Sequence, residues 1–194
     1  MHYERDCIYH VYNRSHEQVF FEKNHYFNFL RKVKLYIQPC CEILAWCLMP
    51  NHFHFLVQTT PQSIEDIQEA HRPGTQQLSK NWGTLLSSYT QAINKQYDKS
   101  GPLWAQRTKA KMLNGQKEDY VLICLQYIHQ NPLRAGLVKC PEDWEYSSFN
   151  DFIGRKNGRL VNRELALETL GMSVQSFKKF VQRDINPTSL EKIF

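Results

Sequence analysis

Two histidines, His52 and His54, flank one apolar residue directly after a Pro50-Asn51 turn. If they lie in a β-strand, side chains alternate between the two faces, so both imidazoles point the same way, roughly 7 Å apart at the backbone. Neutral imidazoles bind divalent metals, and a rigid strand can hold two of them ready for one cation. The spacing alone also fits a pair of solvated strand histidines, so further residues have to decide between the two interpretations.

A tyrosine and an asparagine could complete such a site. Tyr127 and Asn131 are four residues apart in a predicted helix and therefore lie on one helix face. The tyrosine offers a phenolic nucleophile, which must lose its proton first because its ordinary pKa is near 10. A cation held by His52, His54 and Asn131 could polarise a phosphodiester oxygen. The alternatives are a half-buried structural tyrosine, with Tyr120 as the rival nucleophile, and an asparagine that acts as a turn or cap residue.

Periodic segments around these residues predict the elements that position them. Strands are predicted over 8–14, 42–50, 52–58 and 103–113, and helices over 24–37, 77–97 and 117–130, the last ended by Asn131-Pro132 and Gly136. This order is typical of a split β-α-β, ferredoxin-like fold with one additional helix. In that helix, His129 lies about 200° around from Tyr127, which favours packing or capping over metal binding.

The fold class predicted is therefore α+β, a ferredoxin-like antiparallel sheet with helices packed on it, plus a small helical C-terminal appendage. Helical patterns at 163–170 and 174–181 form the appendage. We predict a catalytic domain over residues 1–154 and the appendage over residues 155–194.

Composition limits the class of protein. A chain of 194 residues with 42% hydrophobic and 13% aromatic content can bury a core. No apolar stretch reaches the roughly 18 residues of a membrane helix, and the charged start Met1–Asp6 is unlike a signal peptide, so a cytoplasmic protein with no membrane partner is expected. Six cysteines without paired CxxC spacing are expected to be reduced core thiols rather than disulfides.

Charge indicates how a polyanion could be held. The net charge of +5 mildly favours such a partner. Arg107, Lys109 and Lys111 alternate with uncharged residues, so a strand there presents three cations along one face, where they could follow a phosphate backbone. The alternative is a solvated edge strand whose charges discourage aggregation. Trp104 could stack on an unpaired base, although a core position is favoured.

Taken together, four segments resemble the REP-associated tyrosine transposases, a branch of the single-tyrosine transposases with a His-hydrophobic-His motif. The segments are YHVYNR (9–14), LMPNHFH (48–54), YIHQNPLRAGLV (127–138) and WEYSS (144–148). They span most of residues 8–150 in the order and spacing of the family. The chain departs from it at Ser15, where relatives often have glycine, and at Gln106, where they often have the glycine of a Gly-Arg pair.

The resemblance implies a ferredoxin-like fold and an enzyme that cleaves and rejoins single-stranded DNA near palindromic hairpins. Tyr127 would be the catalytic nucleophile and form a 5′-phosphotyrosine, while His52, His54 and Asn131 would hold Mg²⁺ or Mn²⁺. Arg14 and Arg134 would lie beside the site and contact DNA. The partner would be hairpin-bearing single-stranded DNA, and the unit a monomer or a homodimer.

Two other functions stay open from sequence. One is a domesticated protein that binds DNA hairpins without cleaving them, which the basic strand and the departures at Ser15 and Gln106 favour. The other is a metal-dependent hydrolase that uses activated water, in which Tyr127 is only structural.

Overall fold

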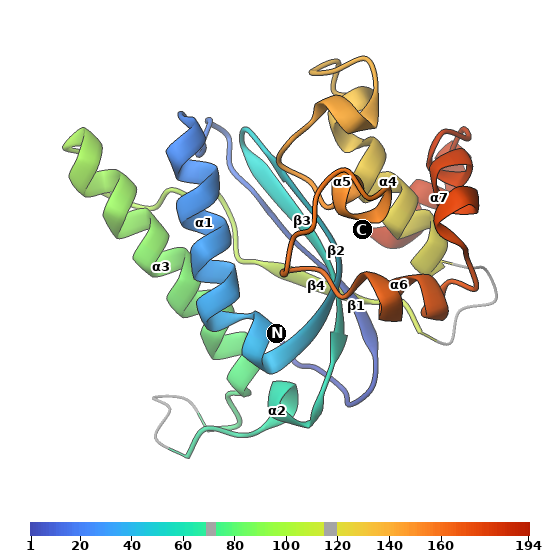
Figure 1. Ribbon diagram of the computed structural model, residues 1–194. Helices are drawn as coiled ribbons and strands as arrows, with labels where there is room; N and C mark the ends of the chain where they lie inside the picture. Colours follow the sequence, from blue (N-terminus) through green and yellow to red (C-terminus); the bar gives the residue numbers. More distant parts are fainter. Residues whose placement is uncertain (69–72, 115–119) are drawn as a thin grey trace.

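The computed structural model describes residues 1–68, 73–114 and 120–194, and its centre is an antiparallel sheet (Figure 1). Its strands are β1 (Ile8–Arg14), β2 (Cys41–Met49), β3 (His52–Thr59) and β4 (Lys109–Met112). They lie in the order β2-β3-β1-β4, and each neighbouring pair is antiparallel. With a helix after β1 and another after β3, this is the ferredoxin-like plan, and the predicted fold class is confirmed.

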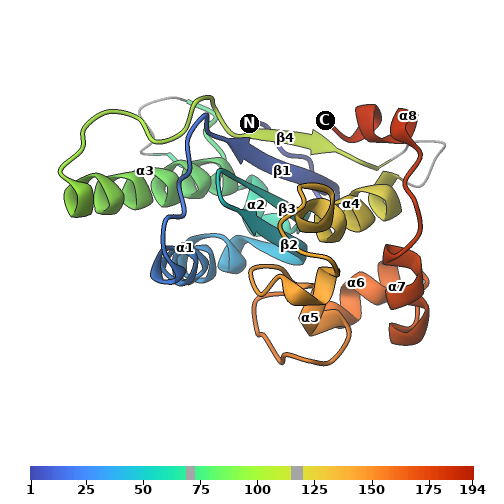
Figure 2. The same ribbon diagram turned by 90° about the horizontal axis from the view of Figure 1, so that it is seen from above.

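Helices α1 (Lys23–Tyr36) and α3 (Gln77–Tyr97) cover one face of the sheet (Figures 1 and 2). The core between them is aromatic. The ring of Phe53 in β3 lies 5.4 Å from that of Phe29 in α1 and stacks 5.6 Å from that of Trp82 in α3. Burying such large rings supplies a substantial apolar driving force, and it fixes which side of β3 faces inward.

The opposite face carries α4 (Tyr120–Arg134) and the elements that follow it (Figure 2). These are α5 (Phe149–Phe152), α6 (Arg163–Thr169), α7 (Val174–Val181) and α8 (Pro187–Leu190), with short 3₁₀ turns at Pro141–Asp143 and Glu191–Ile193. A further 3₁₀ turn, Gln38–Cys40, joins α1 to β2. The side-chain amide of Gln130 in α4 donates to the carbonyl oxygen of Val181. The chain beyond residue 154 therefore packs against α4, and the domain boundary proposed there stays a prediction.

Most predicted elements are present, and β1, α3 and α7 have the predicted bounds. One short helix, α2 (Pro61–Ile64), lies between the predicted strand 52–58 and the predicted helix 77–97, where no element was predicted. The strand predicted over 103–113 is wrong in its first half, because only Lys109–Met112 pair with β1. In that first half, two backbone carbonyl oxygens accept hydrogen bonds from side chains instead of from a neighbouring strand. Asn13 Nδ2 donates to Gln106 O at 3.1 Å, and Ser15 Oγ donates to Leu103 O at 2.8 Å.

The end predicted for α4 at Gln130 is also wrong, while its predicted start at Lys117 lies outside the described residues. The helix continues to Arg134 with Pro132 inside it. Proline has no N–H, so the helix loses one hydrogen bond at this position. Because Pro132 lies in the last turn the loss is local, and Ala135 N still donates to Asn131 O. Gly136, at φ 70°, then ends it. Asn131 thus lies within the helix rather than beyond it.

All six cysteines are free, as predicted. Four are buried in the core, whereas Cys7 is half-buried and Cys140 is exposed, so the predicted core position is wrong for Cys140. Among the residues that the structure describes, no helix combines the length and the apolar character needed to cross a membrane.

Candidate active site

The register of the sheet places both histidines on the face that α4 covers. Arg14 lies opposite His52 and Tyr12 opposite His54, and directly paired residues share a face. The two imidazole rings are 5.2 Å apart, on the side of β3 away from the Phe53 core. The predicted alternation along this strand is confirmed.

Helix α4 brings Tyr127 to the same place. Its ring stands nearly perpendicular to that of His54, with centroids 5.3 Å apart. Asn131, one turn further along, interacts with both the His52 ring and the Tyr127 hydroxyl. Its Nδ2 has no hydrogen-bond partner among the described residues. The structure thus gathers the four residues to which catalytic or metal-binding roles were assigned from sequence.

Burial dominates the electrostatics of the site. It lowers the pKa of His52 to about 4, with Asn131 opposing this shift and the Arg14 guanidinium adding to it. The pKa of His54 lies well below its ordinary value because the ring is fully buried, with His10, His52 and Arg14 adding to the shift. Both imidazoles are therefore neutral at pH 7, the form in which histidine binds metals.

Burial acts on Tyr127 in the opposite direction. It raises the pKa of the phenol, while the positive charge of Arg134 and the Asn131 amide oppose the rise. Arg134 therefore stabilises negative charge on the tyrosine oxygen.

The two imidazoles have different hydrogen-bond partners at Nδ1. His52 Nδ1 is 2.7 Å from Asn51 Oδ1, and His54 Nδ1 is 2.9 Å from Nε2 of the fully buried His10. His54 Nε2 is buried and has no hydrogen-bond partner among the described residues. The sequence interpretation gave no role to His10, although strand alternation places it on the same face as Arg14.

A residue from the far end of the sequence covers the site. The ring of Phe194 is 5.1 Å from that of Tyr127 and 6.0 Å from that of His54, in both cases edge to face. It also contacts His10 and Tyr12. No local pattern in the sequence predicts this contact.

The donor set of the site fits a divalent metal. Among the described residues, the buried Nε2 of His54 has no hydrogen-bond partner, so it can offer a lone pair to a metal. The imidazole of His52 lies beside it as a second nitrogen donor, and the Asn131 amide supplies an oxygen donor. Imidazole suits Mn²⁺ and other transition metals, whereas Mg²⁺ prefers oxygen ligands. Across residues 1–68, 73–114 and 120–194, no group of three or more His, Cys, Asp or Glu side chains is placed to hold a metal. Asparagine and substrate oxygens would have to complete the coordination.

The predicted row of three cations is reduced to two. Lys109 lies opposite Tyr12 and Lys111 opposite His10, so both belong to the face with the histidines. Lys111 Nζ donates to the carbonyl oxygen of Phe194 at 3.1 Å. Arg107 precedes β4 and lines a different pocket, with Met1 and residues of α3, so its predicted place in the row is wrong.

Two further expectations concern packing. His129 lies among three phenylalanine rings and its Nε2 is 2.9 Å from Ser148 Oγ, which confirms a packing role. Trp104 packs against the core rings of Phe29 and Phe53, which favours the core interpretation over base stacking.

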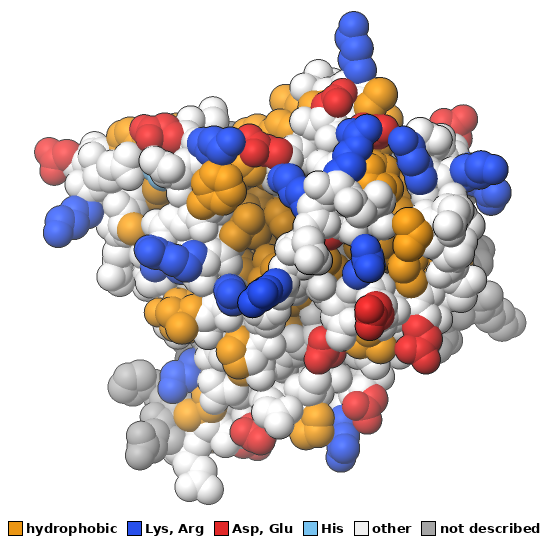
Figure 3. Space-filling view, viewed as in Figure 1, with side chains coloured by type: hydrophobic (Ala, Val, Ile, Leu, Met, Phe, Trp, Pro, Cys, Tyr) orange, Lys and Arg blue, Asp and Glu red, His pale blue; other side chains and the backbone are white. Residues whose placement is uncertain are grey.

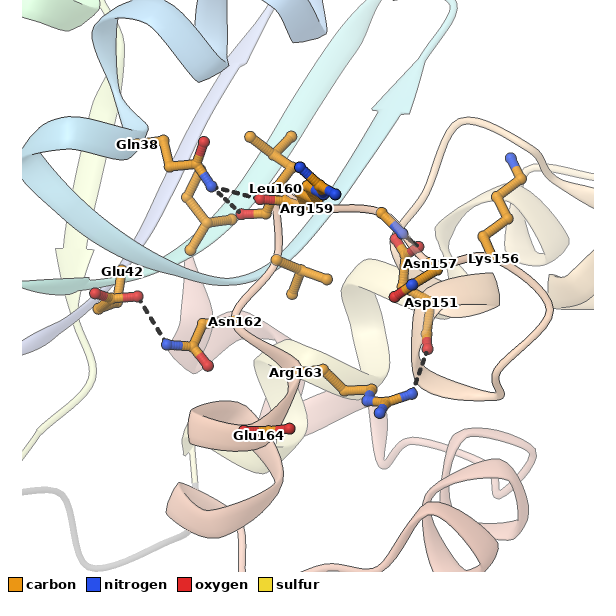
Figure 4. A pocket seen from close by; sticks show the side chains of 13 residues that line it. Gln38, Glu42, Asp151, Lys156, Asn157, Arg159, Leu160, Asn162, Arg163 and Glu164 are labelled. Carbon is orange, nitrogen blue, oxygen red and sulfur yellow. Dashed lines mark hydrogen bonds between the residues drawn. The ribbon is translucent and has the colours of Figure 1, made fainter.

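Two other hollows lie away from the histidine pair. A polar pocket of about 370 Å³ is formed mainly by residues 151–164, and Asn162 there bonds to Glu42 (Figure 4). A more apolar one of about 350 Å³ lies between α1 and the chain after α4, where hydrophobic side chains gather in Figure 3. Its walls include Phe27, Trp46 and Leu160. Neither is lined by the site residues.

Known proteins resemble this chain in sequence. A REP-associated tyrosine transposase of Escherichia coli is 27% identical over 114 residues, which is 59% of this chain and 58% of the relative. A Haemophilus influenzae protein whose name refers to the same family is 30% identical over 114 residues, 56% of this chain and 59% of that protein. The chain thus spans less than two thirds of either relative. No family model matches it.

A solved structure resembles it in fold. This is a REP-associated tyrosine transposase bound to a REP hairpin, which superposes with a TM-score of 0.57 over 80% of this chain and 84% of that chain, at 19% identity. The resemblance to this family that was predicted from the sequence motifs is confirmed by these relatives.

Proposed function

We propose that this protein is a tyrosine transposase of the REP-associated type, which cleaves and rejoins single-stranded DNA next to hairpins. The observation that carries the proposal is the meeting of Tyr127 from α4 with the His52 and His54 pair on one sheet face, with Asn131 in contact with both. The family name of the two sequence relatives supports the same activity. The hairpin in the neighbouring structure supports the same kind of substrate.

The proposed reaction begins at the phenol oxygen. Tyr127 Oη loses its proton and attacks the scissile phosphorus, the bond from phosphorus to the 3′ oxygen breaks, and that oxygen leaves as a 3′-hydroxyl after taking up a proton. The phosphate stays on the tyrosine as a 5′-phosphotyrosine. Attack by a 3′-hydroxyl of DNA reverses the step, joins the strands and frees Tyr127 without ATP.

Positive side chains beside the site would steady the reacting phosphate. Arg14 adjoins His52 across the strand pair, and Arg134 acts on the Tyr127 hydroxyl. Fixed positive charges there would stabilise the additional negative charge of the transition state. His52, His54 and Asn131 would hold Mg²⁺ or Mn²⁺, which when bound supplies a Lewis acid for a phosphate oxygen.

The test uses an oligonucleotide that folds into a hairpin with unpaired flanks, labelled at either end, with Mn²⁺. We expect the 3′-labelled fragment to migrate with the protein on denaturing gels and the 5′-labelled fragment to be released. Tyr127→Phe should abolish the adduct, whereas Tyr120→Phe, the matched change on the same helix, should keep it. Equal cleavage by wild type and Tyr127→Phe, with no adduct, would instead favour hydrolysis by water.

A second candidate function is hairpin binding without cleavage. It is favoured by the Phe194 ring, which lies against both His54 and Tyr127 where a phosphate would have to enter. Tight binding of the same oligonucleotide without nicking, in Mg²⁺ and in Mn²⁺, would support it. Any adduct on Tyr127 would exclude it.

A further inference from the structure

A chain of hydrogen bonds runs from the backbone near the C-terminal residue to the second imidazole of the site. The carbonyl oxygen of Ile193 lies 2.8 Å from His10 Nδ1. His10 Nε2 lies 2.9 Å from His54 Nδ1. His54 Nε2 then has no hydrogen-bond partner among the described residues.

The direction of this chain follows from its first member. A carbonyl oxygen can only accept, so His10 Nδ1 carries the hydrogen. A neutral imidazole has one N–H, so His10 Nε2 is an acceptor, and His54 Nδ1 must donate to it. His10 is fully buried against a backbone carbonyl, a second imidazole and the rings of Tyr12 and Phe194, surroundings that favour the neutral ring. His54 is left with its lone pair on Nε2.

We infer that His10 is a positioning residue which fixes the tautomer of His54, so that Nε2 of His54 is held ready to bind a metal ion. It acts through His54 and does not itself touch the metal. Histidine ligands commonly donate their other ring N–H to such a partner, and losing the partner typically weakens metal affinity by about 10- to 100-fold. The metal-binding half of the inference rests on the proposed function, whereas the tautomer half does not.

The other imidazole obtains the same tautomer from a local source. Asn51 Nδ2 donates to Ser15 O at 3.4 Å, which turns Asn51 Oδ1 toward His52 Nδ1, 2.7 Å away. An amide oxygen only accepts, so His52 Nδ1 carries the hydrogen and the lone pair of the neutral ring is on Nε2. Each imidazole is therefore oriented separately, one by its neighbour in the turn and one by a neighbouring strand.

A purely structural role for His10 is the competing explanation. Its ring stacks on Tyr12, with centroids 4.7 Å apart, and is fully buried, so a variant could fail through packing alone. Two variants separate these roles. His10→Gln can accept from His54 through Oε1 and donate to Ile193 through Nε2, whereas His10→Leu fills the space but offers no acceptor.

The first experiment is ¹⁵N–¹H NMR of metal-free wild-type protein with labelled histidines. We expect His54 as the Nδ1–H tautomer in wild type and in His10→Gln, and loss of that preference in His10→Leu. A wild-type His54 that carries its hydrogen on Nε2 would overturn the inference, and this result needs no variant to fold.

The second experiment measures Mn²⁺ affinity by electron paramagnetic resonance without DNA. We expect His10→Leu to bind about 10- to 100-fold more weakly than wild type and His10→Gln to stay within a few-fold. Wild-type affinity in a folded His10→Leu would overturn the positioning role. If the wild-type protein shows the expected His54 tautomer but binds no Mn²⁺, the result would support the hydrogen-bond chain through His10. It would contradict the metal site in the proposed function.

Discussion

The ring of Phe194 stands edge to face on the ring of Tyr127, with centroids 5.1 Å apart, although the two residues are 67 positions apart in sequence. The contact covers the proposed nucleophile. Under the proposed function, we expect the DNA substrate to displace Phe194 as it approaches the phenol.

We therefore expect Phe194→Ala to speed formation of the Tyr127 adduct. Edge-to-face aromatic pairs contribute about 0.5–1.5 kcal/mol, which corresponds to roughly a 2- to 10-fold gain in initial rate. The rate is measured by quenching reactions with labelled hairpin DNA on denaturing gels. Phe27→Ala, which removes a similarly exposed ring on α1, serves as the control. An unchanged rate in Phe194→Ala would mean that the ring is not a barrier.

Removing an imidazole should weaken metal binding. His54→Ala deletes the buried Nε2 that is proposed to bind the metal, so we expect Mn²⁺ affinity to fall by at least about 10-fold. The loss should exceed that caused by removing His10, which only orients His54. Titration followed by electron paramagnetic resonance measures this. His2→Ala, at an exposed histidine, should bind Mn²⁺ as wild type does.

Chelation with EDTA should stop cleavage by the wild-type protein, and added Mn²⁺ should restore it. Cleavage that persists in EDTA would contradict the proposed metal.

The two lysines of β4 should contribute to DNA affinity through phosphates. Each phosphate neutralised changes the slope of log affinity against log salt by about 0.7 for single strands, so replacing Lys109 and Lys111 by glutamine should flatten it by about 1.4. Fluorescence anisotropy with hairpin DNA at several salt concentrations gives the slope. Lys95→Gln, on α3 across the sheet, is the control. Equal slopes for the double variant and wild type would remove these lysines from the interface.

Acid should destabilise the metal-free protein through buried His129. Burial lowers its pKa from 6.5 to about 3, so between these values the unfolded chain binds a proton that the native state does not. Stability therefore falls as the pH falls. Two pH units below 6.5, at about 1.36 kcal/mol each, give a loss of about 3 kcal/mol from this ring.

Urea unfolding at pH 6.5 and 4.5, with EDTA present, measures the loss. His129→Gln removes the titrating ring and should reduce the pH dependence by about that amount, while His2→Gln should leave it unchanged. A His129→Gln variant with the wild-type pH dependence would show that His129 is protonated in the folded state.

Local patterns predict the local part of this structure well. Alternation around His52 and His54 predicts which side of β3 each residue faces, and four-residue spacing places Tyr127 and Asn131 on one face of α4. These are backbone periodicities, and they need no knowledge of the tertiary structure. The resemblance to the family suggested that the histidines of β3 and Tyr127 of α4 lie together, and the structure places the rings of His54 and Tyr127 in contact.

The remaining features depend on distant contacts. Gln106 has no strand partner because Asn13, 93 residues earlier, bonds to its carbonyl. Pro132 stays helical because it falls in the last turn, and a proline's effect depends on where the helix finally ends. His10 contacts His54, 44 positions later in the sequence, and Phe194 contacts Tyr127, 67 positions earlier; neither contact has a local sequence signature.

The backbone groups on the outer edge of the edge strand β2 are hydrogen-bonded to other segments of the same chain. Leu48 N donates to Tyr146 O, Ser148 N donates to Trp46 O, and Asn162 N donates to Ile43 O. A foreign strand could add there only by displacing these bonds, so the longer margin of the sheet is protected against the edge-to-edge growth that leads to aggregates. On the opposite margin, β4 offers a run of only four residues that includes two lysines, a poor template for such growth.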